Sequence, residues 1–179
     1  MFALTPRLML RPGWPEDAPV LAETIAHEPV VRMTSRVPWP YRIADAQAYL
    51  ARPHDHLHPD CLIFERSHAA LRLIGGIGLY VAQEAHELGY WLTPAVWGRG
   101  FATEAARAMI GHARHGLGVS EVQAGHFADN PASGRVLRKL GFEPTGNVVL
   151  SPSIARGCAD PSVRYRLRLD VLAALPVAA

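Results

Sequence analysis

The hydrophobic and polar positions along the chain fall into short alternating runs and longer helical repeats. Residues 4–11 alternate, with Leu8 and Leu10 on one face, and predict a first strand. The same criteria predict further strands at 61–65, 71–81, 86–92, 121–127, 145–150 and 163–169. Helical spacing predicts helices at 16–25, 45–51, 101–115 and 132–140. Strands in series that then alternate with helices predict an α/β fold, with a mixed sheet of about seven strands flanked by about four helices.

Some details of these elements follow from single residues. In the first helix, Val20, Leu21 and Ile25 are expected to point inward, and Asp45 is a suitable cap for the second helix. The last two strands are expected to form a hairpin joined by a long loop around Cys158. The final residues, 172–179, are expected to fray.

Composition narrows the class of protein. The chain has 179 residues, is 49% hydrophobic and shows no internal repeat or linker, which predicts one domain over 1–179 with its core at about 4–170. Its 18 basic and 16 acidic side chains give a net charge of +2, so charge does not predict a nucleic-acid partner. We find no signal-peptide pattern and no run of about 20 apolar residues, and we therefore expect a cytoplasmic protein with no membrane partner. Cys61 and Cys158 are expected to be free thiols.

A glycine-bearing loop before a helix is the clearest candidate for a binding site. The stretch 88–105 predicts a strand that ends at Pro94, a loop with Gly98 and Gly100, and then the start of a helix. Glycine allows backbone conformations and close approaches that a Cβ would hinder. The free N–H groups and the positive dipole end of the helix favour a phosphate or pyrophosphate. A plain strand–helix turn has the same pattern, so this loop alone does not establish a site.

Three motifs in a fixed order make the pattern more specific. They are Trp97-Gly98-Arg99-Gly100-Phe101-Ala102-Thr103-Glu104-Ala105, Asp129-Asn130-Pro131-Ala132-Ser133 and Leu137-Arg138-Lys139-Leu140-Gly141-Phe142. Over residues 4–170 the order resembles the GNAT superfamily of acetyl-CoA-dependent N-acetyltransferases. The segments 6–12 and 87–92 are similar to its RimJ/RimL branch, which includes enzymes that acetylate the N-termini of ribosomal proteins. Trp97 stands where the broad superfamily has Gln or Arg and where this branch often has an aromatic residue.

The resemblance implies a binding site for acetyl-CoA. The pyrophosphate would lie over the backbone amides that follow Trp97, namely those of Gly98, Arg99, Gly100, Phe101, Ala102 and Thr103. The strands at 86–92 and 121–127 would splay apart, and the pantetheine arm would pair with the exposed edge near Trp91 and Leu92. A backbone N–H there would polarise the thioester carbonyl. Asn130 would hydrogen-bond the cofactor arm, although an Asx turn before Pro131 is the simpler structural role.

Two residues are candidates for proton transfer. Ser133 would donate a proton to the leaving CoA thiolate, or it serves to cap the helix that follows. Glu87 would act as the base for the acceptor amine, directly or through water; alternatively it faces solvent or pairs with an arginine. Glu65 is a second candidate base, and a purely water-mediated route is a third possibility. The tyrosine acid of other GNAT branches has no local candidate, because no tyrosine falls within 129–142.

Aromatic and histidine residues complete the candidate sites. Trp39, Tyr41 and Trp91 would line the acceptor pocket, or they form ordinary core. The cluster at His54, His56 and His58 has a spacing that suits metal ligands, but its flanking prolines favour a surface loop, so we expect no metal.

The sequence thus predicts an N-acetyltransferase that moves an acetyl group from acetyl-CoA to a primary amine by direct attack in a ternary complex. The acceptor would be a protein N-terminus or a small-molecule amine, and a homodimer is compatible with the sequence. A non-catalytic acyl-CoA-binding or regulatory protein, and a scaffold that merely keeps the fold, are the alternatives.

Overall fold

The computed structural model describes residues 1–66, 70–82 and 85–169. Eight strands form one sheet in the order β1-β2-β3-β4-β5-β6-β8-β7, and the β5–β6 pair is parallel whereas the others are antiparallel. The strands are β1 Ala3–Leu4, β2 Leu8–Arg11, β3 Asp60–Arg66, β4 Leu71–Ala82, β5 Ala85–Leu92, β6 Glu121–Phe127, β7 Glu143–Ser153 and β8 Cys158–Arg168. The helices are η1 Pro15–Asp17, α1 Ala18–Ile25, α2 Glu28–Val31, α3 Ile43–Leu50, η2 Pro94–Val96, α4 Phe101–His115 and α5 Pro131–Lys139.

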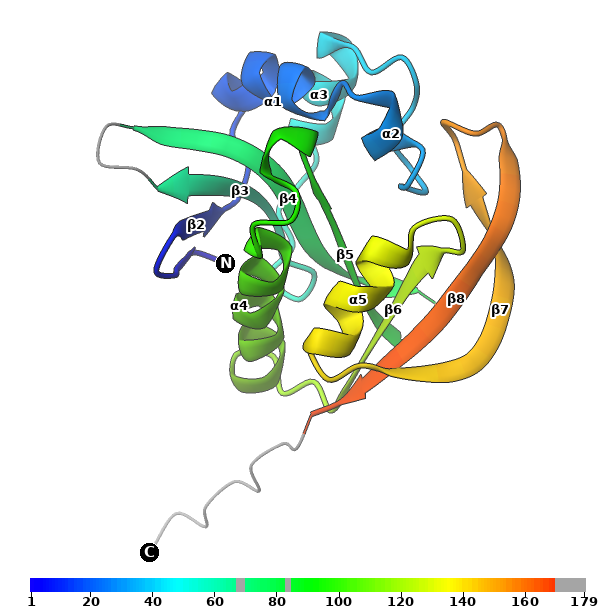
Figure 1. Ribbon diagram of the computed structural model, residues 1–179. Coiled ribbons are helices and arrows are strands. Elements are labelled where there is room, and N and C mark those ends of the chain that lie inside the picture. Colours follow the sequence, from blue (N-terminus) through cyan, green and yellow to red (C-terminus); the bar gives the residue numbers. More distant parts are fainter. Residues whose placement is uncertain (67–69, 83–84, 170–179) are drawn as a thin grey trace, which may run out of the picture.

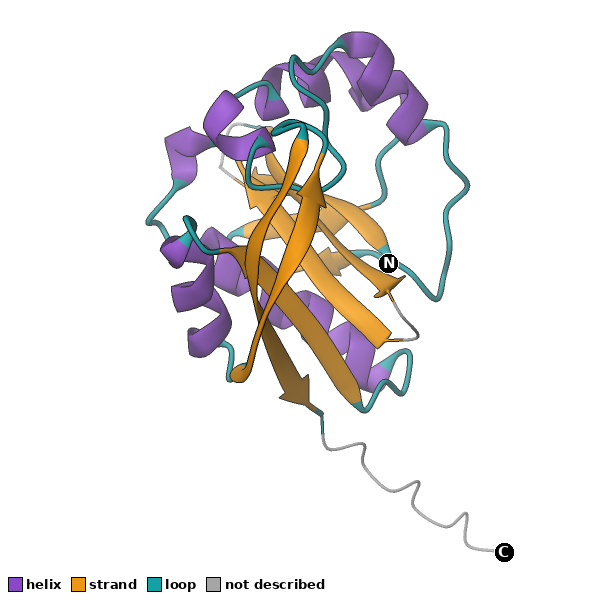
Figure 2. Ribbon diagram, turned by 90° about the vertical axis from the view of Figure 1, so that its right-hand side faces the viewer, coloured by secondary structure: helices purple, strands orange, loops and turns teal. Residues whose placement is uncertain are grey.

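Helices cover both faces of the sheet (Figures 1 and 2). The larger core lies under α4 and α5, where Phe101, Ala105 and Met109 of α4 meet the inward side chains of β2 to β6. A smaller core lies on the opposite face, where Leu21 of α1 and Leu50 of α3 pack on β3 and β4. This three-layer arrangement confirms the predicted mixed α/β fold. Each helix packs its apolar side against one face of the sheet, and a hydrophobic core lies on each face.

Several sequence predictions are wrong in detail. Val20 is 39% exposed, and Ala18 is buried in its place beside Leu21 and Ile25, because the helix begins at Ala18. Asp45 is not the cap: α3 begins after Arg42, and the Asp45 carboxylate accepts a hydrogen bond from the Arg42 N–H at 2.7 Å. The first strand is interrupted by a turn in which Thr5 N–H donates to the Leu8 carbonyl, which separates β1 from β2.

The closing hairpin also differs from its prediction. Cys158 lies at the start of β8 rather than in a long loop, since β7 and β8 pair up to Ser153 and Cys158 and leave only a short turn between them. The predicted fraying of 172–179 falls outside the described residues. Within the described residues, no helix has the length and apolar character needed to cross a membrane.

The central strands separate where the sheet changes direction. β5 and β6 are paired only at His86, Glu87 and Leu88 of β5. β5 continues to Leu92 and β6 to Phe127 without further pairing, so the two strands diverge and leave a gap in the sheet. The predicted splay of these strands is therefore confirmed.

The tip of the β7–β8 hairpin lies beside α2 and the segment that follows it (Figure 1). Ser153 Oγ donates to the Thr34 carbonyl at 2.8 Å, and Ile154 N–H donates to the Ser35 carbonyl at 3.1 Å. Arg156, only 6% exposed in its side chain, donates to the Arg32 carbonyl and pairs with Asp129. The hairpin tip, the segment that follows α2 and the end of β6 are thus held together.

Candidate active site

The loop before α4 has the backbone geometry of an anion cradle. Gly98 and Gly100 have φ values of +75° and +82°, a region that side chains disfavour. The N–H of Glu104 donates to the Gly100 carbonyl as the first bond of the helix. The N–H groups of residues 101–103 precede that bond and have no acceptor within the helix, so they are available to a ligand at the positive end of the helix dipole.

Charged side chains beside this loop are already paired. Burial raises the pKa of Glu104, but hydrogen bonds from Thr5 and from the backbone and side chain of Arg7 outweigh it and leave the pKa lowered. The resulting ion pair with Arg7, at 2.6 Å, offsets the negative charge at the start of α4. The Arg99 side chain pairs with Glu65 at 2.7 Å and stacks on Phe101, and its carbonyl accepts from the Arg7 side chain. The cavity described below includes Gly98 and Gly100 but not Arg99, so the predicted cofactor role of Arg99 has no geometric support.

The diverging part of β5 offers backbone groups to the gap. Thr93 N–H donates to the Ile74 carbonyl of the β4 side, so by strand alternation the main chain of Trp91 also faces β4. The main-chain groups of Tyr90 and Leu92 therefore face the gap. Trp97 Nε1 donates to the Leu92 carbonyl at 2.8 Å, which leaves the Leu92 N–H as a donor for a ligand. Leu92 thus fits its predicted backbone role better than Trp91 does.

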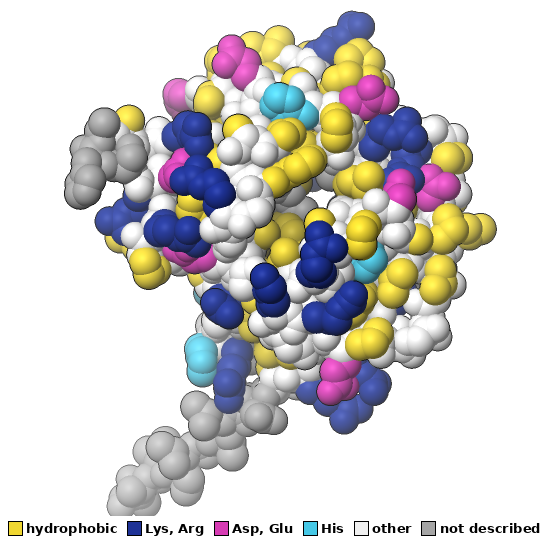
Figure 3. All heavy atoms as spheres, viewed as in Figure 1, with side chains coloured by type: hydrophobic (Ala, Val, Ile, Leu, Met, Phe, Trp, Pro, Cys, Tyr) yellow, Lys and Arg dark blue, Asp and Glu magenta, His cyan; other side chains and the backbone are white. Residues whose placement is uncertain are grey.

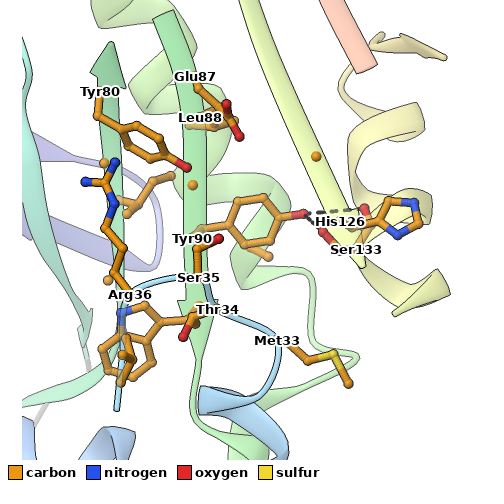
Figure 4. Close-up of a pocket in the computed structure, with 18 of the residues that line it drawn as sticks. Met33, Thr34, Ser35, Arg36, Tyr80, Glu87, Leu88, Tyr90, His126 and Ser133 are labelled. Carbon is orange, nitrogen blue, oxygen red and sulfur yellow. Dashed lines mark hydrogen bonds between the residues drawn. The ribbon is translucent and has the colours of Figure 1, made fainter. Parts of the chain in front are cut away.

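A tyrosine and a serine meet across the gap. The Tyr90 hydroxyl and Ser133 Oγ are 2.8 Å apart, with Tyr90 on β5 and Ser133 in the first turn of α5 (Figure 4). Burial raises the pKa of Tyr90 to about 12, although the hydrogen bond with Ser133 lowers it. Asn130 is the cap of α5, because its Oδ1 accepts from the Ser133 N–H at 3.2 Å. Ser133 is therefore not the cap, and its hydroxyl stays on the gap side with a protonated tyrosine as its partner.

Glu87 lies on the opposite face of β5 from Tyr90 and is held by an arginine. Arg164 of β8 donates to both carboxylate oxygens, at 3.0 and 2.7 Å, and the Glu87 side chain is 14% exposed. The hydrogen-bonded Glu87 carboxylate raises the pKa of Arg164. On the same side, burial and then the Glu87 charge raise the pKa of Tyr80 to about 12. Protonation of Glu87 would break this bidentate pair, which opposes its action as a free base.

Aromatic rings lie close against two glycines on the same face of the sheet as Glu87. A Cβ on Gly76 would come within 2.6 Å of Trp91 Nε1, and one on Gly89 within 3.0 Å of Tyr80 Cε1. These two glycines therefore give the Trp91 and Tyr80 rings the room to line the sheet face. Tyr41 packs against the same clusters as Trp91.

One cavity of about 2150 Å³ connects these groups. It runs from the glycine loop, past Tyr90 and Ser133, to the face with Trp91, Tyr80 and Glu87. Figure 3 shows the hollow, with Lys and Arg side chains gathered beside it over α5, which carries Arg135, Arg138 and Lys139. An anionic ligand is favoured near these cations, so the cavity has one side suited to phosphates and another lined by aromatic rings.

Most of the predicted site residues line this cavity. These are Tyr41, Glu87, Trp91, Leu92, Trp97, Gly98, Gly100, Phe101, Ala102, Thr103, Asn130 and Ser133. Trp39 does not line it and is 41% exposed, so its predicted acceptor role has no geometric support. Glu65 lies away from the cavity, where it pairs with Arg72 and Arg99, and it is not placed to act as a base.

The histidine cluster is a loop at one end of the cavity. His58 Nδ1 lies 2.5 Å from the Asp55 carboxylate, and both residues are at the surface. In the part of the chain that the structure describes, no group of three His, Cys, Asp or Glu side chains is placed to hold a metal ion. Cys61 is buried and Cys158 exposed, and neither is in a disulfide.

Sequence reasoning missed Tyr90, Tyr80, Arg36 and Arg164. Tyr90 lies within the strand predicted at 86–92. It is in phase with Leu88 and Leu92, so the alternation of side chains places these three residues on the same face of the strand. Arg164 is 77 residues from its partner Glu87, so no local pattern connects them.

Comparison with known proteins agrees with this geometry. A family model described as "Acetyltransferase (GNAT) domain" matches residues 7–143. The Bacillus subtilis protein "Uncharacterized N-acetyltransferase YoaA" is 39% identical over 77 residues, which are 41% of this chain and 44% of YoaA. The match therefore spans less than half the length of that curated relative.

Solved structures with the same fold are more distant in sequence. A GNAT-family acetyltransferase from Bacillus anthracis has a TM-score of 0.78 at 19% identity, covering 94% of this chain and 98% of that one. The RimL ribosomal L7/L12 alpha-N-protein acetyltransferase, solved in complex with coenzyme A, has a TM-score of 0.77 at 17% identity, covering 96% and 99%. At these identities the similarity shows the fold alone.

Proposed function

Because the chain belongs to the GNAT acetyltransferase family, we propose that it transfers an acetyl group from acetyl-CoA to a primary amine by direct attack, with donor and acceptor bound together. The observation that carries this proposal is the single cavity that joins the glycine loop to the aromatic face through the gap between β5 and β6. A direct transfer needs this continuity, since the amine must reach a thioester that is held from the other side.

The residues on the α4 and α5 side fit acetyl-CoA. The N–H groups of residues 101–103 and the open space at Gly98 suit a pyrophosphate, for which charged hydrogen bonds contribute ~1.5–3 kcal/mol each. The gap-facing main chain of Tyr90 and Leu92 would pair with the amides of the pantetheine arm. Asn130 would orient α5 through its cap and present its amide to the same arm.

The chemistry is assigned to groups at the gap. The Leu92 N–H would donate to the thioester carbonyl and stabilise the negative charge that develops on its oxygen. Ser133 Oγ would donate a proton to the leaving sulfur, and the Tyr90 hydroxyl would replace that proton along the 2.8 Å hydrogen bond. Tyr90 lines the cavity and would regain its own proton from solvent there. In this proposal Tyr90, on β5, takes the place of the tyrosine acid of other GNAT branches, for which residues 129–142 offer no tyrosine.

Glu87 is assigned an assisting role in deprotonation of the amine, directly or through a water molecule. The bidentate ion pair with Arg164 holds its carboxylate in place, so the carboxylate orients the amine or the water, and the proton passes to solvent. A modest assist is sufficient, because an α-amine with a pKa near 8 is already partly neutral at pH ~7.

The acceptor is an amine on a protein N-terminus or on a small molecule. The RimL structure is named for acetylation of a ribosomal protein N-terminus, which favours the first class for a chain of the same fold. The aromatic face of Trp91 and Tyr41 accommodates either class.

The test is amine-dependent release of CoA thiol from acetyl-CoA, with the acetylated product identified by mass spectrometry. The proposal predicts release that saturates with the amine and falls in Glu87→Gln. The Glu87–Arg164 pair is also the observation that favours a non-catalytic acyl-CoA-binding protein. Tight binding of acetyl-CoA, with no amine tested raising the release of CoA thiol above the rate without amine, would support that second function instead.

A further inference from the structure

We propose that the acceptor carries an anionic group in addition to its amine, and that Arg36 binds this group. The inference rests on the proposed function and specifies its substrate class. It comes from the charges on the acceptor side of the cavity, which is lined by Arg36, Tyr80, Trp91 and Glu87 (Figure 4).

The carboxylates that line the cavity already have partners. Glu87 pairs with Arg164, Asp60 with Arg52, Asp129 with Arg156, Asp55 with His58 and Glu121 with Arg168, and Asp45 accepts the Arg42 N–H. Among the described residues of this wall, an acceptor with a second ammonium group would therefore find only Asp45 without a cationic partner, since the Arg42 N–H is uncharged. Binding a polyamine at any of the other carboxylates would require breaking an existing ion pair, which disfavours that class.

Arg36 is in the opposite situation. Its guanidinium lies over the Tyr80 ring at 4.9 Å from the centroid, and within the described residues no carboxylate is within ion-pair distance of it. Tyr80 stays neutral, because burial and the Glu87 charge raise its pKa to about 12. The Arg36 charge acts on the nearby Asp60 carboxyl, whose pKa burial nevertheless raises, but Asp60 forms its ion pair with Arg52. Among the described residues, the Arg36 guanidinium is therefore oriented by a ring and in ion-pair contact with no carboxylate.

The segment that carries Arg36 is held in place. The preceding carbonyls of Thr34 and Ser35 accept hydrogen bonds from Ser153 and Ile154 at the tip of the β7–β8 hairpin. The anchored backbone and the Tyr80 ring direct the Arg36 side chain, and its planar guanidinium presents paired donors that match the geometry of a carboxylate or a phosphate. The amine would then lie toward Glu87 and Trp91, with the anionic group toward Arg36.

The experiment uses matched pairs of acceptors. Phenylalanine and methionine are compared with their carboxamides, and O-phosphoethanolamine with ethanolamine, so that the carboxylate and phosphate sources are separated. The amine of each uncharged partner compound has a lower pKa than the amine of the anionic compound, so a larger fraction of it is neutral and able to attack. A preference for the anionic compound therefore cannot come from the reactivity of its amine. Two quantities are measured on the full chain: kcat/KM by thiol release, and Kd by calorimetry with the protein saturated with CoA.

The variants are Arg36→Gln and, as the matched control, Arg42→Gln, an exposed arginine that does not line the cavity. We expect the anionic member of at least one pair to be favoured by ~10–100-fold, as charged hydrogen bonds predict. That ratio should collapse in Arg36→Gln and persist in Arg42→Gln. Equal values for both members of every pair, or a preference that survives in Arg36→Gln, would overturn the inference.

The two readouts separate this inference from the proposed function. Acetylation of the uncharged amines with no preference for an anion would leave the transferase intact and reject the role of Arg36. Anion-dependent binding that Arg36→Gln abolishes, with no thiol release from any amine, would support the Arg36 site and reject the transferase.

Discussion

Replacing Gly98 by alanine tests the anion cradle, and Gly118 offers a matched control. Both glycines have a positive φ, +75° and +66°, and a Cβ added at either would meet no atom of the protein within 4 Å. Each alanine variant should therefore lose about 1–2 kcal/mol of stability from backbone strain alone. Only Gly98 lines the cavity, where its new methyl would occupy the space assigned to the pyrophosphate.

The expected effect on the ligand is larger than the effect on stability. Loss of one charged hydrogen bond of ~1.5–3 kcal/mol would weaken acetyl-CoA binding by roughly 10–150-fold. At a hundredfold excess over the parent Kd, acetyl-CoA stabilises the parent by ~2.7 kcal/mol, or roughly 5–10 °C. With a Kd about 30-fold higher, the same ligand concentration would stabilise Gly98→Ala by only ~0.9 kcal/mol, or roughly 2–3 °C.

Thermal unfolding with and without acetyl-CoA measures both the loss of stability and the loss of ligand binding. The prediction is that the two variants unfold at similarly lowered midpoints without ligand, and that Gly118→Ala keeps the parent's full ligand shift. A full ligand shift in Gly98→Ala as well would refute the assignment of the loop as the pyrophosphate site.

Three further predictions concern the gap and the fold. Ser133→Ala should lower kcat by about 100-fold or more with little change in the Kd of acetyl-CoA, and Tyr90→Phe should lower kcat less. Single-turnover rates measure both effects. Equal rates in the parent and the two variants would contradict the proton relay from Tyr90 through Ser133. Because the pKa of Tyr90 is raised to about 12, kcat should not fall as the pH rises through about 10, the ordinary value for tyrosine, and a descending limb there in a pH profile would contradict its buried state. Asp17→Asn should cost about 3–5 kcal/mol of unfolding free energy, because it leaves Arg11, 8% exposed, without its ion pair. In the same denaturant titration, Asp55→Asn should change the unfolding free energy little, because the Asp55 carboxylate is exposed to solvent.

The ion pair of Asp17 with Arg11 also makes the free energy of unfolding depend on pH. Burial raises the pKa of Asp17, but hydrogen bonds from Arg11 and the Trp14 N–H, with the Arg11 charge, outweigh it and leave the pKa lowered. The contribution is therefore present above the unfolded value near pH ~4 and is lost as the pH falls toward the folded value. Chemical unfolding between about pH 3 and 6 should show a larger loss in the parent than in Asp17→Asn, which keeps other carboxyls of lowered pKa such as Glu104.

The sequence predicted well the elements whose signals are local. The helix at 101–115 and the strand at 121–127 have the predicted bounds, because glycine and helix-cap signals mark their ends. Gly98 and Gly100 adopt the positive φ values that motivated their selection. Most predicted site residues also reach one cavity, since strand ends and helix starts meet at the same edge of the sheet.

The sequence could not specify contacts between distant segments. The alternative that Glu87 pairs with an arginine is confirmed, but that the partner is Arg164 depends on the register of β8 against β6, which no local pattern reveals. Tyr90 reaches Ser133 only because β5 and β6 diverge after Leu88. Trp39 was chosen as an aromatic in a proline-rich segment, and the direction of its side chain depends on how that segment packs.

The most direct test of direct transfer through one cavity is an initial-rate study in which acetyl-CoA and the preferred amine are varied together. The account predicts double-reciprocal lines that intersect, because both ligands must occupy the cavity before the acetyl group moves. Parallel lines, accompanied by an acetylated protein when acetyl-CoA is added without amine, would show a covalent enzyme intermediate and contradict the account.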